Sequence, residues 1–237
     1  MTGTTSTEAW PRFRPVADHA LLVEFGDAIS IQTNRQVRQL DHLLSATALP
    51  GVVELVPAYT SVLVDFDPLS TDHRRIEAGI RELLAGSVPD LAAGVARDVQ
   101  VCYEGDLAPD LDRVATQCGL SREAAIAMHL SGDYQVFMVG FAPGYAYLGG
   151  VPSALQLPRK PTPVRDIAAG SVIIAGPQCL VTTFIMPTGW WIIGRSPTTI
   201  INPADEQPFL FEIGDTVCFS RIDRDTFNTA MAKRPVA

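Results

Sequence analysis

The pattern of hydrophobic positions in the first hundred residues predicts a small sheet with two amphipathic helices. Short apolar or alternating runs, which are typical of strands, occupy residues 20–25, 52–56 and 61–66. Apolar residues recur at helical intervals in residues 29–49 and 71–84. The order strand, helix, strand, strand, helix is that of a split β-α-β sandwich.

From residue 134 onward the pattern changes to short apolar runs separated by glycine- and proline-rich turns. Such a pattern predicts a β-barrel or a compact sandwich. Two short helices are predicted before it, at residues 110–118 and 121–131. Glycine, serine and proline cluster in residues 85–97, where we expect a domain boundary, and the strand predicted at residues 99–103 is assigned to the second domain.

Composition narrows the class of protein. The chain has 237 residues, of which 47% are hydrophobic, with a formal net charge of -8 and a pI near 4.9. An acidic balance without a basic stripe argues against nucleic acid as a partner, and no long apolar segment or basic amphipathic helix indicates a membrane. We therefore expect a cytoplasmic protein. The four cysteines and four histidines are dispersed without metal-binding spacing, so no dedicated metal site is expected.

Glycine and proline are dense in residues 134–197, which also hold most of the candidate chemistry. These residue types favour shaped turns around a concavity, because glycine permits positive φ and proline fixes φ. Between residues 124 and 204 the acids are only Asp133 and Asp166, and they are outnumbered by Arg159, Lys160, Arg165 and Arg195. The arginines either bind a small anionic or carbonyl substrate, or cap loops and pair with the two acids.

The sequence contains none of the standard catalytic signatures, so catalysis by this chain alone is not expected. Backbone N–H groups near Gly176 and the amide of Gln178 are able to face a developing oxyanion. His129, near the end of a predicted helix, either caps that helix or acts as an acid or base. Tyr145 and the tyrosine two residues later share one face if the segment is extended, toward a pocket or the core. Ser171 lacks an obvious base and fits a structural turn better than a nucleophile.

A succession of motifs carries a more specific signal. In the second half it comprises Gly140-Phe-Ala-Pro-Gly-Tyr-Ala-Tyr-Leu148, Pro158-Arg159, Arg165, Ala169-Gly-Ser-Val-Ile-Ile-Ala-Gly176, Gln178 and Gly189-Trp-Trp-Ile-Ile-Gly-Arg-Ser-Pro197. With motifs in the first half, such as Asp18-His-Ala-Leu-Leu-Val-Glu-Phe-Gly-Asp27, it resembles the bacterial 5-oxoprolinase B-subunit family over residues 15–222. That family also includes the kinase inhibitor KipI and proteins labelled allophanate hydrolase subunit 1. The chain departs from the family pattern after Gln178, where Cys179-Leu-Val-Thr-Thr183 replaces the usual Thr-Gly-Ile-Tyr-Pro.

The resemblance implies an α+β fold with a ferredoxin-like N-terminal domain and a cyclophilin-like β-barrel C-terminal domain. Combined with the pattern above, it gives the expected limits of each part. These are a disordered N-terminus at 1–15, the first domain at 16–95, the barrel domain at 96–225 and a C-terminal tail at 226–237.

The same resemblance implies an activity that needs several chains. It implies the B-subunit of an ATP-dependent hydrolase that opens 5-oxoproline to glutamate, in complex with a companion C-subunit and an A-subunit. ATP with Mg is expected to be bound by the complex and not by a phosphate-binding loop of this chain. Two alternatives stay open: a KipI-like regulator that inhibits a histidine kinase, and an amidohydrolase or carboxyltransferase component acting on allophanate or urea-type amides.

Seven residues are the candidates for the site. The expected acid or base is His129. The expected substrate-binding residues are Arg159, Arg165 and Arg195 for an anion or carbonyl, Gln178 and Gly176 for an amide, and Tyr145 as the aromatic wall.

Overall fold

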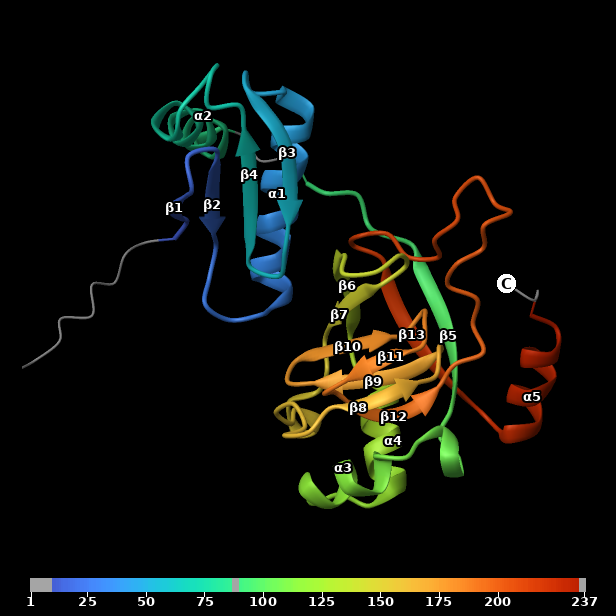
Figure 1. Cartoon of the computed structure of the whole chain (residues 1–237). Coiled ribbons are helices and arrows are strands. Elements are labelled where there is room, and N and C mark those ends of the chain that lie inside the picture. The colour runs from blue at the N-terminus through green and yellow to red at the C-terminus, as the bar shows by residue number, and fades with distance from the viewer. Residues whose placement is uncertain (1–9, 87–89, 235–237) are drawn as a thin grey trace, which may run out of the picture. The chain divides into compact units, whose positions relative to one another are not determined.

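The computed structural model describes residues 10–86 and 90–234, and the chain divides into two compact units, 1–92 and 93–237 (Figure 1). The expected disordered N-terminus up to residue 9 and the last three residues of the expected tail lie outside the described residues. The described parts of both segments are ordered, because they form the strand Arg12–Val16 and the helix Arg224–Ala232. A five-residue strand and a polar nine-residue helix give weak sequence patterns, which explains why the sequence does not reveal them.

The first unit is an antiparallel sheet with two helices. In spatial order its strands are β1 (Arg12–Val16), β2 (Ala20–Glu24), β4 (Ser61–Phe66) and β3 (Val52–Pro57), and its helices are α1 (Ile31–Thr47) and α2 (His73–Ala85). Each helix begins after a side chain, Ser30 or Asp72, that accepts a hydrogen bond from the backbone N–H three residues later. Alternate residues of the strands are buried, so one face of the sheet forms a core with the apolar stripes of both helices.

The edge of this sheet differs from the sequence-based expectation. β1 pairs with β2 in a hairpin and thereby fills the edge position. In a ferredoxin-like sheet that position belongs to the strand after the second helix. Here that strand, β5 (Ala96–Cys102), lies in the barrel of the second unit. The ferredoxin-like description of the first unit therefore stays a prediction.

The second unit is built on a closed seven-stranded barrel. Around it the order is β10 (Gln178–Val181), β7 (Ala146–Gly149), β6 (Tyr134–Val139), β13 (Thr216–Ile222), β5, β12 (Trp191–Arg195) and β9 (Ser171–Ala175). β13 runs parallel to β5, and the other paired neighbours are antiparallel. The expected barrel within a mixed α and β chain is confirmed, and its cyclophilin-like assignment stays a prediction.

Short elements complete the second unit. The helical ones are α3 (Leu111–Gln117), α4 (Arg122–Leu130), α5 (Arg224–Ala232) and the 3-10 turns η1 (Gly105–Leu107) and η2 (Ser153–Leu155). β8 (Val164–Ile167) and β11 (Met186–Thr188) form a two-stranded ribbon outside the barrel sheet. None of the helices in the described parts of the chain is both long and apolar enough to cross a membrane.

Alternation along the barrel strands sorts their side chains into two clusters. Ile174 of β9 and Trp191 of β12 pack inside the barrel in its large core. Their sequence neighbours Ile173 and Trp190 belong to a second buried cluster, which includes Ile167 of the ribbon. Since successive side chains of a strand point to opposite faces, this second cluster lies on the outer face of the barrel, under the ribbon. The candidate site is built on this outer face.

Candidate functional site

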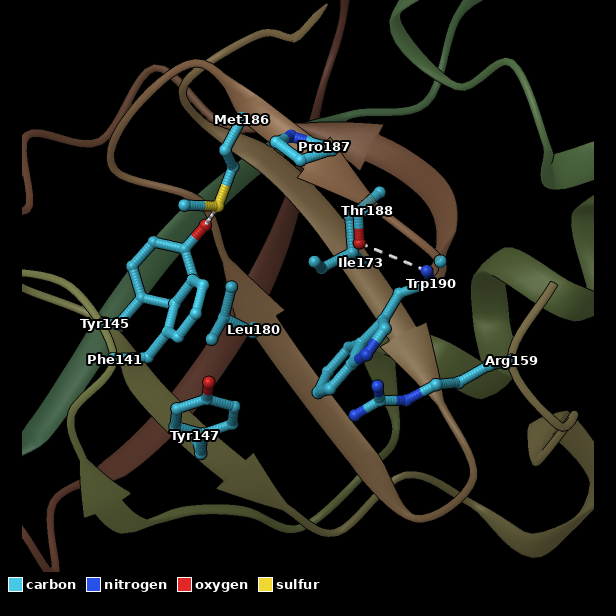
Figure 2. A pocket seen from close by; sticks show the side chains of 11 residues that line it. Phe141, Tyr145, Tyr147, Arg159, Ile173, Leu180, Met186, Pro187, Thr188 and Trp190 are labelled. Atoms are coloured by element: carbon cyan, nitrogen blue, oxygen red, sulfur yellow. Dashed lines mark hydrogen bonds between the residues drawn. The ribbon is translucent and has the colours of Figure 1, made fainter. Parts of the chain in front are cut away.

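A cavity of about 350 Å³ opens between the outer face of the barrel and the ribbon (Figure 2). Its lining comprises Phe141, Tyr145, Tyr147, Arg159, Ile173, Leu180, Met186, Pro187, Thr188, Gly189 and Trp190. β9 and β10 supply the barrel side, and β11 supplies the ribbon side. Concave, mainly apolar pockets with a few polar groups are the usual form of small-molecule sites, so we take this cavity as the candidate site.

Arg159 is the one cation among the described residues that line the cavity. Its guanidinium carbon lies 5.6 Å from the centre of the Trp190 ring, within the range of cation–π attraction. The side chain is exposed, and it takes part in none of the ion pairs or hydrogen bonds found between described residues. The guanidinium is therefore available to an anion, to which it offers two parallel N–H donors.

Lys160, the next residue, is engaged within the fold. Its side chain is 5% exposed, and Nζ donates to Oδ2 of Asp110 at 2.7 Å. The same oxygen accepts the backbone N–H of Ile192 at 2.8 Å, so the carboxylate ties the start of α3 to β12. Lys160 therefore has a structural role in the second unit and is not available to a ligand.

Four aromatic rings form one wall of the cavity. Ring centres lie 5.7 Å apart for Phe141 and Tyr145, 6.3 Å for Tyr145 and Tyr147, and 6.1 Å for Tyr147 and Trp190. The Tyr145 hydroxyl donates to the sulfur of Met186 (Figure 2). Burial, with a smaller contribution from Tyr147, raises the pKa of Tyr145 to about 12. Tyr145 therefore stays a neutral hydrogen-bond donor at physiological pH.

The rim of the cavity is strained and apolar. Phe141 has a φ of 72°, a left-handed conformation that is a genuine outlier for a bulky residue, and its side chain is 81% exposed. The loop that precedes β11 adds the exposed side chains of Phe184 and Ile185. The Thr183 hydroxyl donates to the Pro143 carbonyl at 2.9 Å, which joins the two loops that carry these residues. We call Phe141, Phe184 and Ile185 the apolar rim.

Four other predicted binding residues lie outside the cavity lining. Arg165 is exposed on β8, and Gln178 and Gly176 lie at the tight turn between β9 and β10. Arg195, at the end of β12, donates from Nε to the Ala169 carbonyl at 3.2 Å. Burial lowers the pKa of Arg195 from its usual value. Of the seven candidates, the structure brings Arg159 and Tyr145 together in the cavity.

His129 lies in the barrel core, 1% exposed. Its Nδ1 is 2.8 Å from the Tyr103 hydroxyl, and its Nε2 is 3.8 Å from the Cys179 sulfur. Burial lowers the pKa of His129 to about 3 and raises that of the Cys179 thiol, so both groups are neutral at physiological pH. His129 is not among the residues that line the cavity.

Several lining residues were not among the seven candidates predicted from the sequence. Met186 and Thr188 lie on a three-residue strand interrupted by Pro187, which gives no strand pattern. Trp190 and Trp191 are adjacent, so their rings are expected on opposite faces of a strand, but nothing in the sequence indicates which ring faces a cavity. The structure places Trp191 in the barrel core and Trp190 in the outer cluster. The alternation with Tyr145 was the available signal for Tyr147.

The lining supports binding and hydrogen bonding, without groups for proton transfer at neutral pH. Among the described residues that line the cavity there is no carboxylate, imidazole, thiol or amine. Within residues 10–86 and 90–234, no group of three or more His, Cys, Asp or Glu side chains is placed to hold a metal ion. ATP with Mg²⁺ requires oxygen ligands for the metal and several phosphate donors, and these lining residues do not fit it.

The class of protein follows from comparison with known families. The family described as carboxyltransferase domain, subdomain C and D, matches residues 11–211. The 5-oxoprolinase B-subunit of Bacillus subtilis is 35% identical over 225 residues, which is 90% of this chain and 93% of that protein. The 5-oxoprolinase B-subunit of Escherichia coli O157:H7 is 32% identical, over 86% of this chain and 93% of that protein.

A solved structure extends the comparison to the fold. The crystal structure of TTHA0988 superposes with a TM-score of 0.73 at 32% identity, over 86% of this chain but only 40% of that one. TTHA0988 is thus a longer polypeptide of which this chain spans less than half. Together the matches show that this chain belongs to the 5-oxoprolinase B-subunit family.

Proposed function

We propose that this chain is the B-subunit of an ATP-dependent 5-oxoprolinase complex, and that the cavity holds 5-oxoproline while its amide is opened to glutamate. The observation that carries the proposal is the guanidinium of Arg159, which has no ion-pair partner among the described residues and lies beside an aromatic cavity. The names of the curated relatives favour this activity over a kinase regulator or a urea-type amide enzyme.

The cavity matches the two parts of such a substrate. The carboxylate pairs with the guanidinium of Arg159, whose planar fork fits two carboxylate oxygens. The flat ring packs against the aromatic wall of Tyr147 and Trp190. Hydroxyls of the wall are suitable donors for the lactam carbonyl. Tyr145, whose present acceptor is a thioether sulfur, would gain a stronger acceptor in a carbonyl oxygen.

The chemical step requires groups from outside this cavity. The overall reaction consumes two water molecules. One opens the lactam: its oxygen goes to the carbonyl carbon as the C–N bond breaks, and its protons go to the nitrogen. The other is consumed as ATP is converted to ADP and phosphate. Because the lining holds no acid or base that titrates near neutrality, this chain binds and orients the substrate. ATP with Mg²⁺ is bound by the complex at a place other than this cavity, whose lining does not fit it.

The apolar rim is the surface proposed to receive the companion C-subunit, with the A-subunit completing the complex. Exposed aromatic and aliphatic side chains next to a site mark protein interfaces. The left-handed backbone of Phe141, a strained conformation of the kind that clusters at functional sites, supports the same assignment. In TTHA0988 the matching region is part of a longer chain, which is consistent with a companion domain that acts beside this one.

The activity test uses the three proteins purified together. ATP-dependent release of glutamate from 5-oxoproline is the expected result, and none of it with the B-subunit omitted. If no glutamate is released with all three proteins present and folded, the proposed activity is wrong.

The interface test changes the rim. Ile185→Asp places a charge on the rim, where Ile185 is 71% exposed in the free chain, and Leu69→Asp is the matched control on the first unit, where Leu69 is 97% exposed. We expect Ile185→Asp to weaken binding of the C-subunit at least about tenfold, the loss of roughly 1.4 kcal/mol at an interface anchor. Equal binding by both variants would place the interface elsewhere.

A further inference from the structure

The charged side chains that line the cavity are of one sign only. Its described lining contains one guanidinium, from Arg159, and no carboxylate. Its other polar side chains are hydroxyls, those of Tyr145, Tyr147 and Thr188. Asp166 on the paired strand β8 is exposed and is not part of the lining. A negatively charged group of a ligand therefore finds a counter-charge in this cavity, whereas a positively charged group does not.

A cavity with only a positive charge should bind carboxylate ligands differently according to whether they also carry an ammonium group. A free α-amino acid carries an ammonium group beside its carboxylate at neutral pH. Bringing an ammonium group out of water without a counter-charge is unfavourable, and the guanidinium of Arg159 repels it in addition. When the same nitrogen is acylated it is a neutral amide, which needs only a hydrogen-bond acceptor.

Resting on the proposed function for the identity of the site, we infer that the cavity selects carboxylates whose α-nitrogen is acylated and rejects those with a free α-ammonium. The selection also favours release of the product. Hydrolysis of the lactam breaks the C–N bond and creates both an ammonium group and a second carboxylate. The product therefore loses its fit to the cavity at the moment it forms, so glutamate leaves and does not compete with substrate.

A matched pair of ligands tests the inference directly. Proline and 5-oxoproline share the five-membered ring and the carboxylate, and they differ in the carbonyl that makes the nitrogen an amide. We expect 5-oxoproline to bind the full chain at least about tenfold more tightly than proline, a difference of about 1.4 kcal/mol, measured by calorimetry or ligand-observed NMR. N-acetylglycine and glycine, which lack the ring, should show the same order.

A variant of the cavity wall sharpens the test. Met186 is partly exposed and accepts the Tyr145 hydroxyl, and glutamate has a similar length and offers that hydroxyl a better acceptor. Met186→Glu supplies the missing counter-charge and should narrow the ratio between 5-oxoproline and proline several-fold. Met186→Gln, which has the same shape without the charge, should keep the wild-type ratio. Thermal unfolding of both variants shows that each is folded before its ratio is read.

The outcomes separate this inference from the proposed activity. Equal binding of proline and 5-oxoproline to the wild type overturns the inference, and so does a cavity that binds neither at millimolar concentration. An unchanged ratio in folded Met186→Glu also overturns it. If acylated carboxylates bind preferentially but the reconstituted complex does not turn over 5-oxoproline, the proposed function fails and the inference stands.

Discussion

The interior of the barrel and the cavity on its outer face share strands of the barrel, yet the polar groups in the two places differ in exposure and in pairing. In the interior, His129 is sealed from solvent and hydrogen-bonded to Tyr103. On the outer face, Arg159 is exposed and has no ion-pair partner among the described residues. Both are titratable or charged groups in the same Gly- and Pro-rich half of the chain. Burial with a partner marks a structural group, and exposure without one marks a group free to bind a ligand.

The largest expected effect concerns the neighbours Lys160 and Arg159. Lys160→Met removes one partner of a buried ion pair and leaves Asp110 uncompensated, although its N–H donor from Ile192 remains. We expect the free energy of unfolding to fall by about 3 to 5 kcal/mol, measured by urea denaturation. Arg159→Met should lower it by no more than about 1 kcal/mol, the usual value of an exposed cation–π contact such as the one with Trp190. Comparable losses from both variants would erase the contrast between the two positions.

The second prediction uses acid to probe the interior. The pKa of His129 is lowered to about 3 in the folded chain, so the unfolded chain binds its proton more readily. The stabilisation from a neutral His129 is therefore fully present above pH 6.5 and is lost as the pH falls toward 3, and on the order of 3 kcal/mol of it is lost by pH 4. His129→Gln should flatten this part of the profile when stability is measured between pH 7 and pH 4. A wild-type profile no steeper than that of the variant would contradict a buried neutral imidazole.

The third and smallest effect probes the cavity wall with alkali. The pKa of Tyr145 is raised to about 12, above the usual value near 10, so the folded chain keeps a proton that the unfolded chain loses. The resulting stabilisation is present below pH 10 and is lost as the pH rises through 12, by about 1 to 2 kcal/mol. Tyr145→Phe should lack this component, and absorbance titration of the phenol should show one late-ionising tyrosine fewer. If the variant instead loses a tyrosine that ionises near pH 10, Tyr145 has an ordinary pKa and this prediction is wrong.

Much of the fold could be predicted from the sequence, because the spacing of apolar residues in a long helix or strand shows which of its faces is buried. α1, α2 and the alternating strand β4 lie where the pattern predicts them. The ribbon strand β8 was not predicted, because most residues of Val164–Ile167 are exposed and the segment shows no hydrophobic pattern. The barrel was predicted from the short apolar runs and from the family resemblance. Its strand order was not predicted, since the pairing of β5 with β13 joins segments more than a hundred residues apart.

The site was predicted in part. The excess of cations over acids pointed to Arg159, and the spacing of aromatic residues pointed to Tyr145. The same reasoning could not separate Arg159 from Arg195, because both follow Gly/Pro turns and only closure of the barrel shows that Arg195 meets the Ala169 carbonyl. It also could not place His129, whose burial depends on strands that close around it from distant parts of the sequence.

The central claim is that Arg159 is the anion-binding group of the site, and its most direct test is the binding of 5-oxoproline to two arginine variants. Arg159→Met removes the guanidinium at the cavity, and Arg165→Met removes an exposed guanidinium from β8, outside the lining, as the matched control. Losing one charge-assisted contact should weaken binding about ten- to a hundredfold, or roughly 1.5 to 3 kcal/mol, for Arg159→Met. Arg165→Met should stay within about twofold of wild type, less than 1 kcal/mol. Equal affinities of Arg159→Met and wild type, with both chains folded, would contradict the account.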